Sequence, residues 1–556
     1  MDWKKRLKTD ITDVVVLVAL LMVGAFHEYM SCLLSVALGI CLLVRIGKAK
    51  TFVFRQDLLS VSVILIVVGY AATCLWAVDR GMAFIGFMKF LPLLLFMLLR
   101  WQESGEKRAL EILPYFAAAM AVISAIGMQI PAISHHFSVA DRLAGFFQYP
   151  NTFAVFLLVC ELLLLKKPKK AWYDYVTLAL LVAGLLYTGS RTVFVLFLAL
   201  TFAMLLVLFP KKGKVALLAG AGLAVLVVAL LALGGNPVIA RYLNISLTES
   251  TFVGRILYFV DALPLLLKYP FGMGYMGYYY IQGSIQTGVY SVAYIHNDFL
   301  QLLLDIGWIP GLVFIGAIVS YFVKKQIPLA DKIVVAALCL HSLFDFNLQM
   351  IGMFLVLLLL LDQPDAKVHT VPVKVLGKVV LGGVTAVSLY MGAALLTSHL
   401  GHWQLADRLY PYNTRNTLSI LEQETDLEKA NALADRILTY NKQCFAPYSI
   451  KAKYSYTKGD FTAVIENKYA AFERNPFGHM EYEEYCQMLL NGITLYLKAG
   501  DTKSAQFCKD QLLQTQKLLS ANAQRLSELG KMIDDQPVTE LSQQLQQQIQ
   551  KIGGSQ

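Results

Sequence analysis

Residues 191–209 have the sequence RTVFVLFLALTFAMLLVLF, in which Arg191 is the only charged side chain and the next eighteen residues are nearly all apolar. A helix of about 20 mainly apolar residues is long enough to cross the roughly 30 Å of hydrocarbon in a bilayer. This segment is therefore predicted to be a transmembrane helix that begins at an arginine.

Similar apolar segments occupy most of the chain as far as residue 399. They cover residues 11–26, 29–45, 58–78, 82–99, 109–130, 151–165, 171–188, 214–234, 298–323, 330–344, 349–361 and 373–399. With 57% hydrophobic and only 15% charged residues, the composition is too apolar for a soluble chain of this length. The predicted fold class is all-α: a polytopic membrane helix bundle of about 12–13 transmembrane helices, followed by a C-terminal helical-repeat domain.

The net charge of +10 comes from the apolar part of the chain. Residues 1–399 carry 31 basic and 20 acidic side chains, whereas residues 400–556 carry 17 and 18. A surplus confined to membrane connections indicates topology and does not point to a nucleic-acid partner.

The basic residues also alternate between successive connections. One set of alternate connections holds 24 lysines and arginines, and the opposite set holds six, namely Arg80, Arg142, Arg191, Arg241, Arg255 and Lys268. By the positive-inside rule, the chain is a multi-pass protein of the cell membrane with a cytoplasmic N-terminus. With an odd number of spans, the C-terminal domain is extracytoplasmic, and one miscounted span would reverse this last expectation.

The predicted outer face has two long connections, residues 131–150 and 235–297. Long loops in compact structures are usually functional or disordered, and the aromatic content of 235–297 argues against disorder. Residues 256–267 form an apolar stretch between Arg255 and Lys268, with Pro264 inside it. This stretch is predicted to be a helix at the membrane surface.

The chain becomes polar after about residue 400. We predict a transmembrane domain at 1–399 that includes loop 235–297, an extracytoplasmic helical domain at 400–535, and a flexible Gln-rich tail at 536–556. Helical blocks are expected near 403–410, 427–441, 445–458, 461–474, 480–499 and 502–530. The positions of turn glycines, packing alanines and Asn475-Pro476 fit two or three tetratricopeptide-like repeats. The same residues fit an irregular helical bundle.

Arg191 and Arg255 stand out on the predicted outer face, because a guanidinium stays charged and needs an anion, water or carbonyl partner. Two arginines brought together would suit a diphosphate, since each planar group can bind two phosphate oxygens. Arg191 would also fit a helix-end anchor, and Arg255 a loop salt bridge.

His296 lies where the long outer loop meets the next span. An imidazole has the pKa range needed to accept a proton from a hydroxyl group near neutral pH. The alternative is a cap, with Asn297 or Asp298 at the helix N-terminus. His341 and Asp345 are four residues apart on one face of the eleventh predicted span, and we expect a buried polar pair that orients helices and not a second catalytic site.

Together these segments resemble the O-antigen ligase and polymerase superfamily. The motifs are Phe146-Phe-Gln-Tyr-Pro-Asn151, Thr188-Gly-Ser-Arg-Thr192, Gly254-Arg255 and His296-Asn-Asp-Phe-Leu-Gln-Leu-Leu-Leu-Asp-Ile-Gly307, and His341 to Asp345 is similar to a later motif. The resemblance covers residues 60–360 and implies a GT-C-like membrane glycosyltransferase. Asp305 stands where relatives often have glutamate.

The resemblance also implies roles for individual residues. His296 would be the catalytic base, and Arg191 and Arg255 would bind the diphosphate of an undecaprenyl-diphosphate-linked oligosaccharide. The remaining candidate substrate-binding residues are Ser190, Asn151, Asn297, Asp298 and Asp305, with Arg142, His341 and Asp345 as candidates for supporting roles. Neither a metal nor a cofactor is expected, and the chain contains no Walker A or dinucleotide-binding motif.

The expected activity is inverting transfer or polymerisation of a lipid-linked glycan on the outer face of the membrane. The acceptor would be a growing glycan, a lipid or a protein; the last would make the chain a protein O-oligosaccharyltransferase. Polymerisation is slightly favoured, because the repeats could hold a glycan chain or a protein partner. A glycolipid transporter or flippase would instead need polar residues through the full membrane depth, and a scaffold would not need the arginines.

Overall fold

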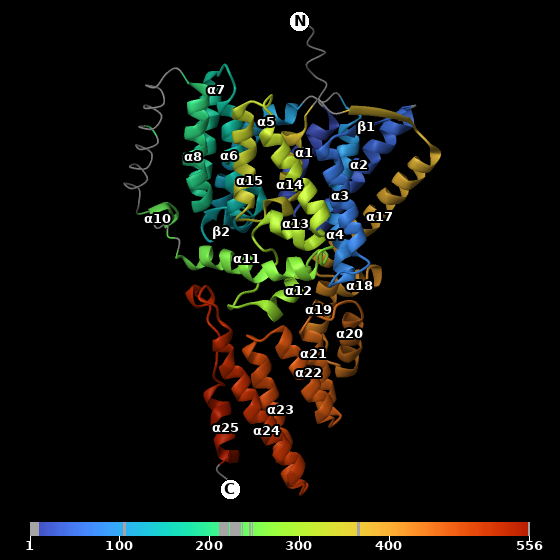
Figure 1. The fold of residues 1–556 in the computed structure, drawn as a ribbon, viewed down its shortest axis with the longest axis vertical. Helices are drawn as coiled ribbons and strands as arrows, with labels where there is room; N and C mark the ends of the chain where they lie inside the picture. The colour runs from blue at the N-terminus through green and yellow to red at the C-terminus, as the bar shows by residue number, and fades with distance from the viewer. Residues whose placement is uncertain are drawn as a thin grey trace. The chain divides into compact units, whose positions relative to one another are not determined.

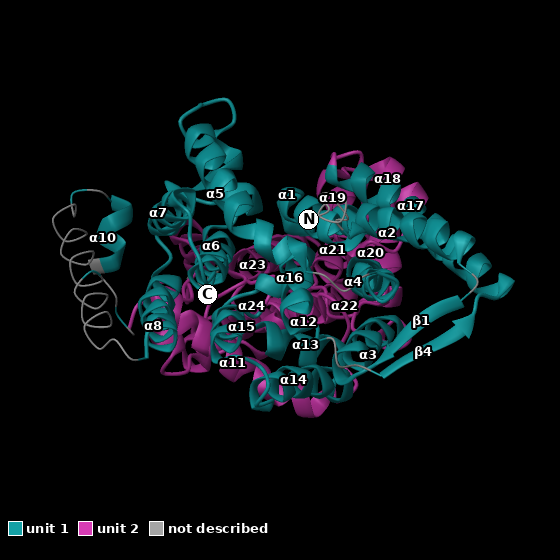
Figure 2. Cartoon of the chain, turned by 90° about the horizontal axis from the view of Figure 1, so that it is seen from above, with its two compact units in different colours: residues 1–72, 84–246, 295–399 teal, residues 73–83, 247–294, 400–556 magenta. Residues whose placement is uncertain are grey.

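The computed structural model describes residues 10–49, 51–103, 107–210, 237–243, 248–363 and 367–553, together with residues 222, 235 and 246. The described chain is mainly helical (Figure 1). It divides into two units, coloured separately in Figure 2. Unit 1 comprises residues 1–72, 84–246 and 295–399, and unit 2 comprises residues 73–83, 247–294 and 400–556. Most of the predicted outer loop therefore groups with the tail, whereas the sequence placed it in the transmembrane domain.

Most of the apolar helices belong to unit 1. They are α1 (Ile11–Leu21), α2 (Glu28–Lys48), α3 (Leu58–Thr73), α4 (Arg80–Arg100), α5 (Arg108–Met128), α6 (Pro150–Leu165), α7 (Trp172–Tyr187), α8 (Arg191–Leu208), α13 (Asp298–Ile306), α14 (Trp308–Val323), α15 (Leu329–Ser342), α16 (Ile351–Leu361) and α17 (Val375–His399), with the short α10 (Pro237–Leu243).

Six described helices are long and apolar enough to cross a membrane: α2, α4, α5, α8, α17 and α11 (Ser250–Lys268) of unit 2. A further six are apolar but shorter. The prediction of an all-α polytopic membrane protein is confirmed. The predicted span 214–234 lies outside the described residues, except for residue 222.

The predicted single span 298–323 is two helices, α13 and α14, separated by Gly307. Gly307 has φ +85° and ψ 179°, a combination that side chains disfavour. Pro310, in the first turn of α14, has no N–H to continue the hydrogen bonds of α13. The prediction of one continuous helix was wrong, because it rested on hydropathy and ignored these two residues.

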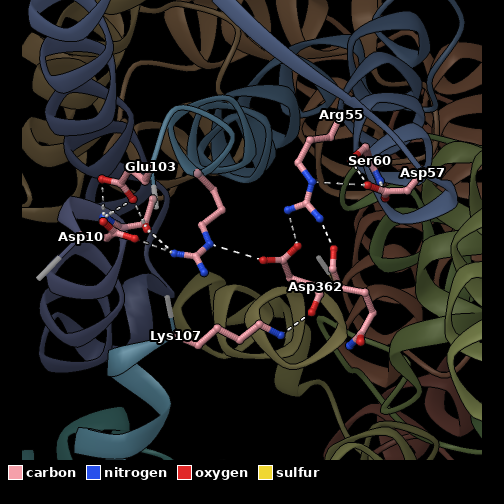
Figure 3. A network of polar contacts seen from close by, with 10 residues as sticks. Asp10, Arg55, Asp57, Ser60, Glu103, Lys107 and Asp362 are labelled. Atoms are coloured by element: carbon pink, nitrogen blue, oxygen red, sulfur yellow. Dashed lines mark hydrogen bonds and ion pairs between the residues drawn. The ribbon is translucent and has the colours of Figure 1, made fainter. Parts of the chain in front are cut away.

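A polar network joins several connections at one end of unit 1 (Figure 3). The carboxylate of Asp362 lies between Arg55, at 2.7 Å, and Arg100, at 3.4 Å, and its carbonyl oxygen accepts a hydrogen bond from Lys107. Arg100 also contacts Asp10 at 3.3 Å. Burial lowers the pKa of Lys107 to about 8, although Asp362 opposes this shift.

Two strands that the sequence did not predict lie at the same end. Strand β1 (Thr51–Gln56) pairs antiparallel with β4 (Lys367–Pro372), and Thr51 lies opposite Pro372. Lys166 also contacts Asp331 at 2.5 Å across two further connections. Several of the basic connections that were assigned to one membrane face therefore contact each other in the described part of unit 1, whereas residues 211–214 lie outside it. Their cytoplasmic orientation stays a prediction.

Unit 2 contains α11, α12 (Gly277–Ile285) and the tail helices α18 (Trp403–Leu409), α19 (Thr414–Gln423), α20 (Leu427–Tyr440), α21 (Ala446–Thr457), α22 (Phe461–Arg474), α23 (His479–Lys498), α24 (Thr502–Ala521) and α25 (Gln543–Gly553). Successive tail helices pack on their neighbours, as helical hairpins do. The sequence missed α19, which Asn413 caps by accepting a hydrogen bond from the Asn416 N–H. The tetratricopeptide assignment stays a prediction.

Helix α11 runs through Pro264 and packs against the polar tail. Leu257 and Ile533 share one apolar cluster. Asp261 accepts hydrogen bonds from Thr287 and Tyr290, and Thr287 also contacts Ser527 at 2.9 Å. These contacts with polar segments favour a surface helix, as the sequence predicted, although the length and composition of α11 also fit a span.

Residues 543–553 of the Gln-rich end form helix α25. Leu541 and Leu545 are each 5% exposed and belong to the core around α23. Leu545 and Ile549 are four residues apart and lie on one face of α25, and Leu541 precedes the helix. The apolar residues among the glutamines therefore favour a packed helix over residues 543–553, and the assignment of residues 536–556 as a flexible tail stays a prediction.

Candidate active site

The site begins at the segment between α5 and α6. Residues 138–143 form a small hairpin of β2 (Ser138–Val139) and β3 (Arg142–Leu143), followed by a turn and by Pro150 at the start of α6. Proline suits this first helical position because its fixed φ matches a helix and its missing N–H is not needed there. Arg142 and Asn151 are thereby held close together, and Arg142 Nη2 donates a 2.7 Å hydrogen bond to Asn151 Oδ1.

His296 faces a buried carboxylate. Its Nδ1 lies 3.4 Å from Oδ1 of Asp345, which is inaccessible to solvent, whereas the His296 side chain is 20% exposed. The ring of His296 also packs edge-on against Phe346, with the centroids 5.0 Å apart. One side of the imidazole is therefore oriented by Asp345, and the exposed part can reach another molecule.

The backbone at His296 has φ +56°. A positive φ is unusual for a residue with a side chain and costs free energy, and such residues cluster at functional sites. His296 directly precedes Asn297, whose side chain caps α13 by accepting a hydrogen bond from the Leu300 N–H at 3.0 Å. The cap fixes where α13 begins and therefore where His296 is placed.

Other groups hold Asp345 in position. Tyr149 donates to Oδ1 at 2.8 Å, and Asn151 Nδ2 donates to Oδ2 at 2.9 Å. The N–H of Phe346 donates to Oδ1 at 3.0 Å. These bonds satisfy a carboxylate that would be costly to bury without partners, and they fix the oxygen that faces His296.

The expectation for His341 and Asp345 needs correction. Helix α15 ends at Ser342, so Asp345 lies beyond the helix and not on one face of it with His341. His341 Nδ1 contacts Asn347 Oδ1 at 3.1 Å, and its Nε2 is 4.0 Å from Asp345. Asp345 is thus part of the His296 site, whereas His341 lies on the far side of Asp345 and is buried.

A second group of residues gathers at the turn between α7 and α8. Arg142 Nε donates to the carbonyl oxygen of Thr188 at 2.7 Å, and Arg241 Nε donates to that of Gly189 at 3.3 Å. Gly189 has φ +61°, and a Cβ there would lie 3.4 Å from Arg142 Nε, so a glycine suits this position. Ser190 follows at the N-cap position of α8, and Arg191 is the first residue of the helix.

Arg142, Arg191 and Arg241 form a cationic cluster. Burial, together with the positive charges of Arg241 and Arg191, lowers the pKa of Arg142 to about 10, which still leaves it protonated at neutral pH. Arg142 and Arg241 donate hydrogen bonds to backbone carbonyl oxygens and to the amide oxygen of Asn151, which are neutral and do not cancel the positive charge. An anion is the natural ligand for such a group.

The structure therefore brings six of the predicted residues together: His296, Asp345, Asn151, Arg142, Ser190 and Arg191. A continuous path runs from His296 through Asp345 and Asn151 to Arg142. From Arg142 it reaches the turn that carries Arg191. A base and a cationic cluster connected in this way have the groups needed to deprotonate a hydroxyl and bind a departing anion.

Other predicted residues have different surroundings. Asn297 caps α13, and Asp298 Oδ2 accepts a hydrogen bond from the Leu348 N–H at 3.0 Å. Asp305 is buried, and it accepts hydrogen bonds from Tyr70 at 2.9 Å and Gln301 at 2.8 Å. These contacts lie within the protein, and the roles of the three residues in substrate binding stay predictions. Arg255 belongs to unit 2, in the second turn of α11 near Tyr258.

Two residues of this site were missed. Tyr149 stands inside the 146–151 motif, and its spacing from Asn151 was the available signal. Arg241 was counted only as one of six outer-face cations, because it lies between the recognised motifs and belongs to none of them. Among the described residues, no group of three or more His, Cys, Asp and Glu side chains is placed to hold a metal ion.

A family model described as O-antigen ligase matches residues 176–315. This range contains α7, α8, Arg191, Arg255 and His296. The match supports the resemblance to the ligase and polymerase superfamily and a membrane enzyme of glycan transfer in general terms. No curated protein shows a significant match to the chain.

Proposed function

We propose that this protein transfers a glycan from a membrane-embedded lipid diphosphate to an acceptor hydroxyl on the outer face of the membrane. The observation that carries the proposal is the contact of His296 Nδ1 with Asp345, linked through Asn151 to Arg142. The family match over residues 176–315 supports a lipid-linked glycan as donor. By resemblance, the lipid is undecaprenyl diphosphate.

His296 is proposed as the general base. Asp345 would hold the proton on Nδ1, which leaves Nε2 to accept the proton of the acceptor hydroxyl. The acceptor oxygen then forms a bond to the anomeric carbon while the bond from that carbon to the diphosphate oxygen breaks. The bonding electrons leave with the diphosphate, and attack from the opposite side inverts the carbon.

Arg191 is proposed to stabilise the charge that grows on the leaving diphosphate. A preorganised cation speeds the reaction when its interaction strengthens in the transition state. The resemblance adds Arg255 as a second diphosphate ligand, and this assignment rests on the Gly254-Arg255 motif. The acceptor is proposed to be a growing glycan, which makes the enzyme a polymerase, with a lipid or protein acceptor as the alternatives.

Transfer and transport can be separated with the purified protein in proteoliposomes. The donor would be an undecaprenyl-diphosphate oligosaccharide, and products would be analysed by mass spectrometry. We expect longer or transferred glycans together with released undecaprenyl diphosphate. Movement of intact donor between leaflets without any new glycosidic bond would overturn the proposal in favour of a flippase.

A further inference from the structure

A cavity of about 550 Å³ lies in unit 1 between α5, α7 and α10. Its lining is mainly apolar and includes Ala121, Ala125, Leu180, Ala183, Tyr187 and Val238. The volume lies within the usual range for ligand pockets. Ala125 and Ala183 are exposed and Tyr187 is 55% exposed, so the cavity opens to the surface of two apolar helices. In a membrane bundle, such an opening admits lipid chains.

The cavity ends at the arginine cluster. Val238 lines the cavity, and its Cγ1 lies 3.2 Å from the position that a Cβ on Gly189 would occupy. Gly189 is also the residue that Arg142 and Arg241 approach. Asp141, which precedes Arg142, is an exposed carboxylate on the cavity wall. The cavity therefore combines a mainly apolar lining with an end, near Gly189, where Arg142 and Arg241 lie together with one exposed acid.

A ligand that satisfies both parts is an amphiphile with an apolar chain and a multiply charged anionic head. Arginine binds phosphate oxygens through paired N–H donors, and three arginines suit a head with more charge than a single phosphate diester. A diphosphate gains negative charge when the glycosidic bond breaks. Cations at this place would therefore bind the leaving group more tightly than the intact donor.

We propose that the α5–α7–α10 cavity holds the polyprenyl chain of the lipid diphosphate donor, and that Arg142 and Arg241 join Arg191 in binding its phosphates. The identity of the donor rests on the proposed function. The chain would enter between α5 and α7, and the glycan would extend from the arginine cluster along the path toward His296.

Binding of the polyprenyl chain and binding of the diphosphate head can be tested separately with the full protein in phosphatidylcholine nanodiscs. The probes are farnesyl diphosphate, which has both parts, and inorganic pyrophosphate, which has the head alone. Wild-type protein should bind farnesyl diphosphate at least about 10-fold more tightly than pyrophosphate, because the chain buries apolar surface. Equal affinities for the two probes would overturn the proposal that the cavity holds the polyprenyl chain.

Two substitutions test where the apolar chain and the diphosphate head bind. Ala125→Phe fills the cavity and should remove the advantage of farnesyl diphosphate without changing pyrophosphate affinity. Ala119→Phe is the matched control, because Ala119 is an exposed alanine of α5 that does not line the cavity. Arg241→Gln should weaken both probes about 10-fold or more, since it removes a charged hydrogen-bond donor. Arg80→Gln, outside the cluster, should weaken neither.

The remaining outcomes separate this proposal from the proposed function. Unchanged binding in Ala125→Phe and Arg241→Gln would overturn the cavity assignment, even if the wild-type protein transfers glycan. Displacement of farnesyl diphosphate by equimolar phosphatidylglycerol would also overturn it, and would make the cavity a phospholipid site. Binding as predicted, in a protein that forms no glycosidic bond, would uphold the cavity and overturn the proposed function. Thermal unfolding of each variant shows whether it is folded.

Discussion

Arg142 donates a 2.7 Å hydrogen bond to Asn151, and this contact joins the arginine cluster to the carboxylate that faces His296. Residues in one hydrogen-bond network affect each other's energetics, whereas distant residues act additively. Substitutions in the arginine cluster should therefore alter the energetic contribution of His296 to catalysis, and substitutions at His296 should alter that of the cluster.

The first prediction concerns this coupling. In a double-mutant cycle, Arg142→Ala and Asn151→Ala should be coupled by about 1–2 kcal/mol in transition-state free energy, measured as kcat/KM for glycan transfer. The reason is that each single variant already removes their shared hydrogen bond. Asn151→Ala combined with Ser62→Ala is the control, because Ser62 bonds only its own helix at Leu59. Additive effects of Arg142 and Asn151 would contradict the network.

The second prediction concerns Asp345 as a positioning residue. Asp345→Asn removes the negative charge that faces His296 Nδ1, whereas the amide oxygen can still accept the hydrogen bonds from Tyr149 and the Phe346 N–H. We expect kcat to fall by about 10²-fold or more with little change in KM, because the imidazole loses the counter-charge that stabilises its protonated form during the reaction, while donor binding is kept. Glu161→Gln is the control, since Glu161 is a buried carboxyl group that contacts Thr201. A KM effect alone would be evidence against the role.

The third prediction concerns the network of Figure 3. Asp362→Asn should lower the free energy of unfolding by about 3 kcal/mol, because Arg55 and Arg100 both lose the carboxylate that they share, and Arg100, which is 2% exposed, retains Asp10 alone. Asp331→Asn should cost less than about 1 kcal/mol, since the Lys166–Asp331 pair is one-third exposed and screened by water. Denaturation in detergent measures both, and equal losses would show that Asp362 has no special role.

The fourth prediction concerns α25. Leu545→Ala should destabilise unit 2 by about 2–4 kcal/mol, as expected for a leucine buried in a core. Gln547→Ala, at an exposed position of the same helix, should have little effect. Hydrogen exchange of residues 543–553 provides the measurement, and rapid exchange in the wild-type protein would mean that the segment does not form a stable helix.

Much of unit 1 could be predicted from hydropathy, because a bilayer requires long apolar segments and penalises charge within them. The grouping of the basic connections followed from their alternation. Hydropathy could not detect the break at Gly307, since the residues on both sides of it are apolar. Strands β1 and β4 were also missed, because they pair across more than 300 residues and neither has a partner nearby in the sequence.

For the site, the motifs predicted His296, Arg191 and Asn151, but not how they are connected. Asp345 was assigned to a helix face because it is four residues from His341. Helix α15 ends at Ser342, so Asp345 lies outside the helix and contacts His296 instead. The motif predicts Asn297 and Asp298 as substrate ligands, and the structure adds that Asn297 caps α13. Arg241 has no motif, and only the fold brings it to Gly189.

The most direct test is the rate of a single turnover in the His296→Ala variant, measured together with the dissociation constant of the lipid-diphosphate oligosaccharide. If His296 is the base, the variant should bind the donor about as tightly as wild-type protein while transferring glycan roughly 10²–10⁴-fold more slowly. Transfer at the wild-type rate in a folded His296→Ala protein would contradict the proposed mechanism.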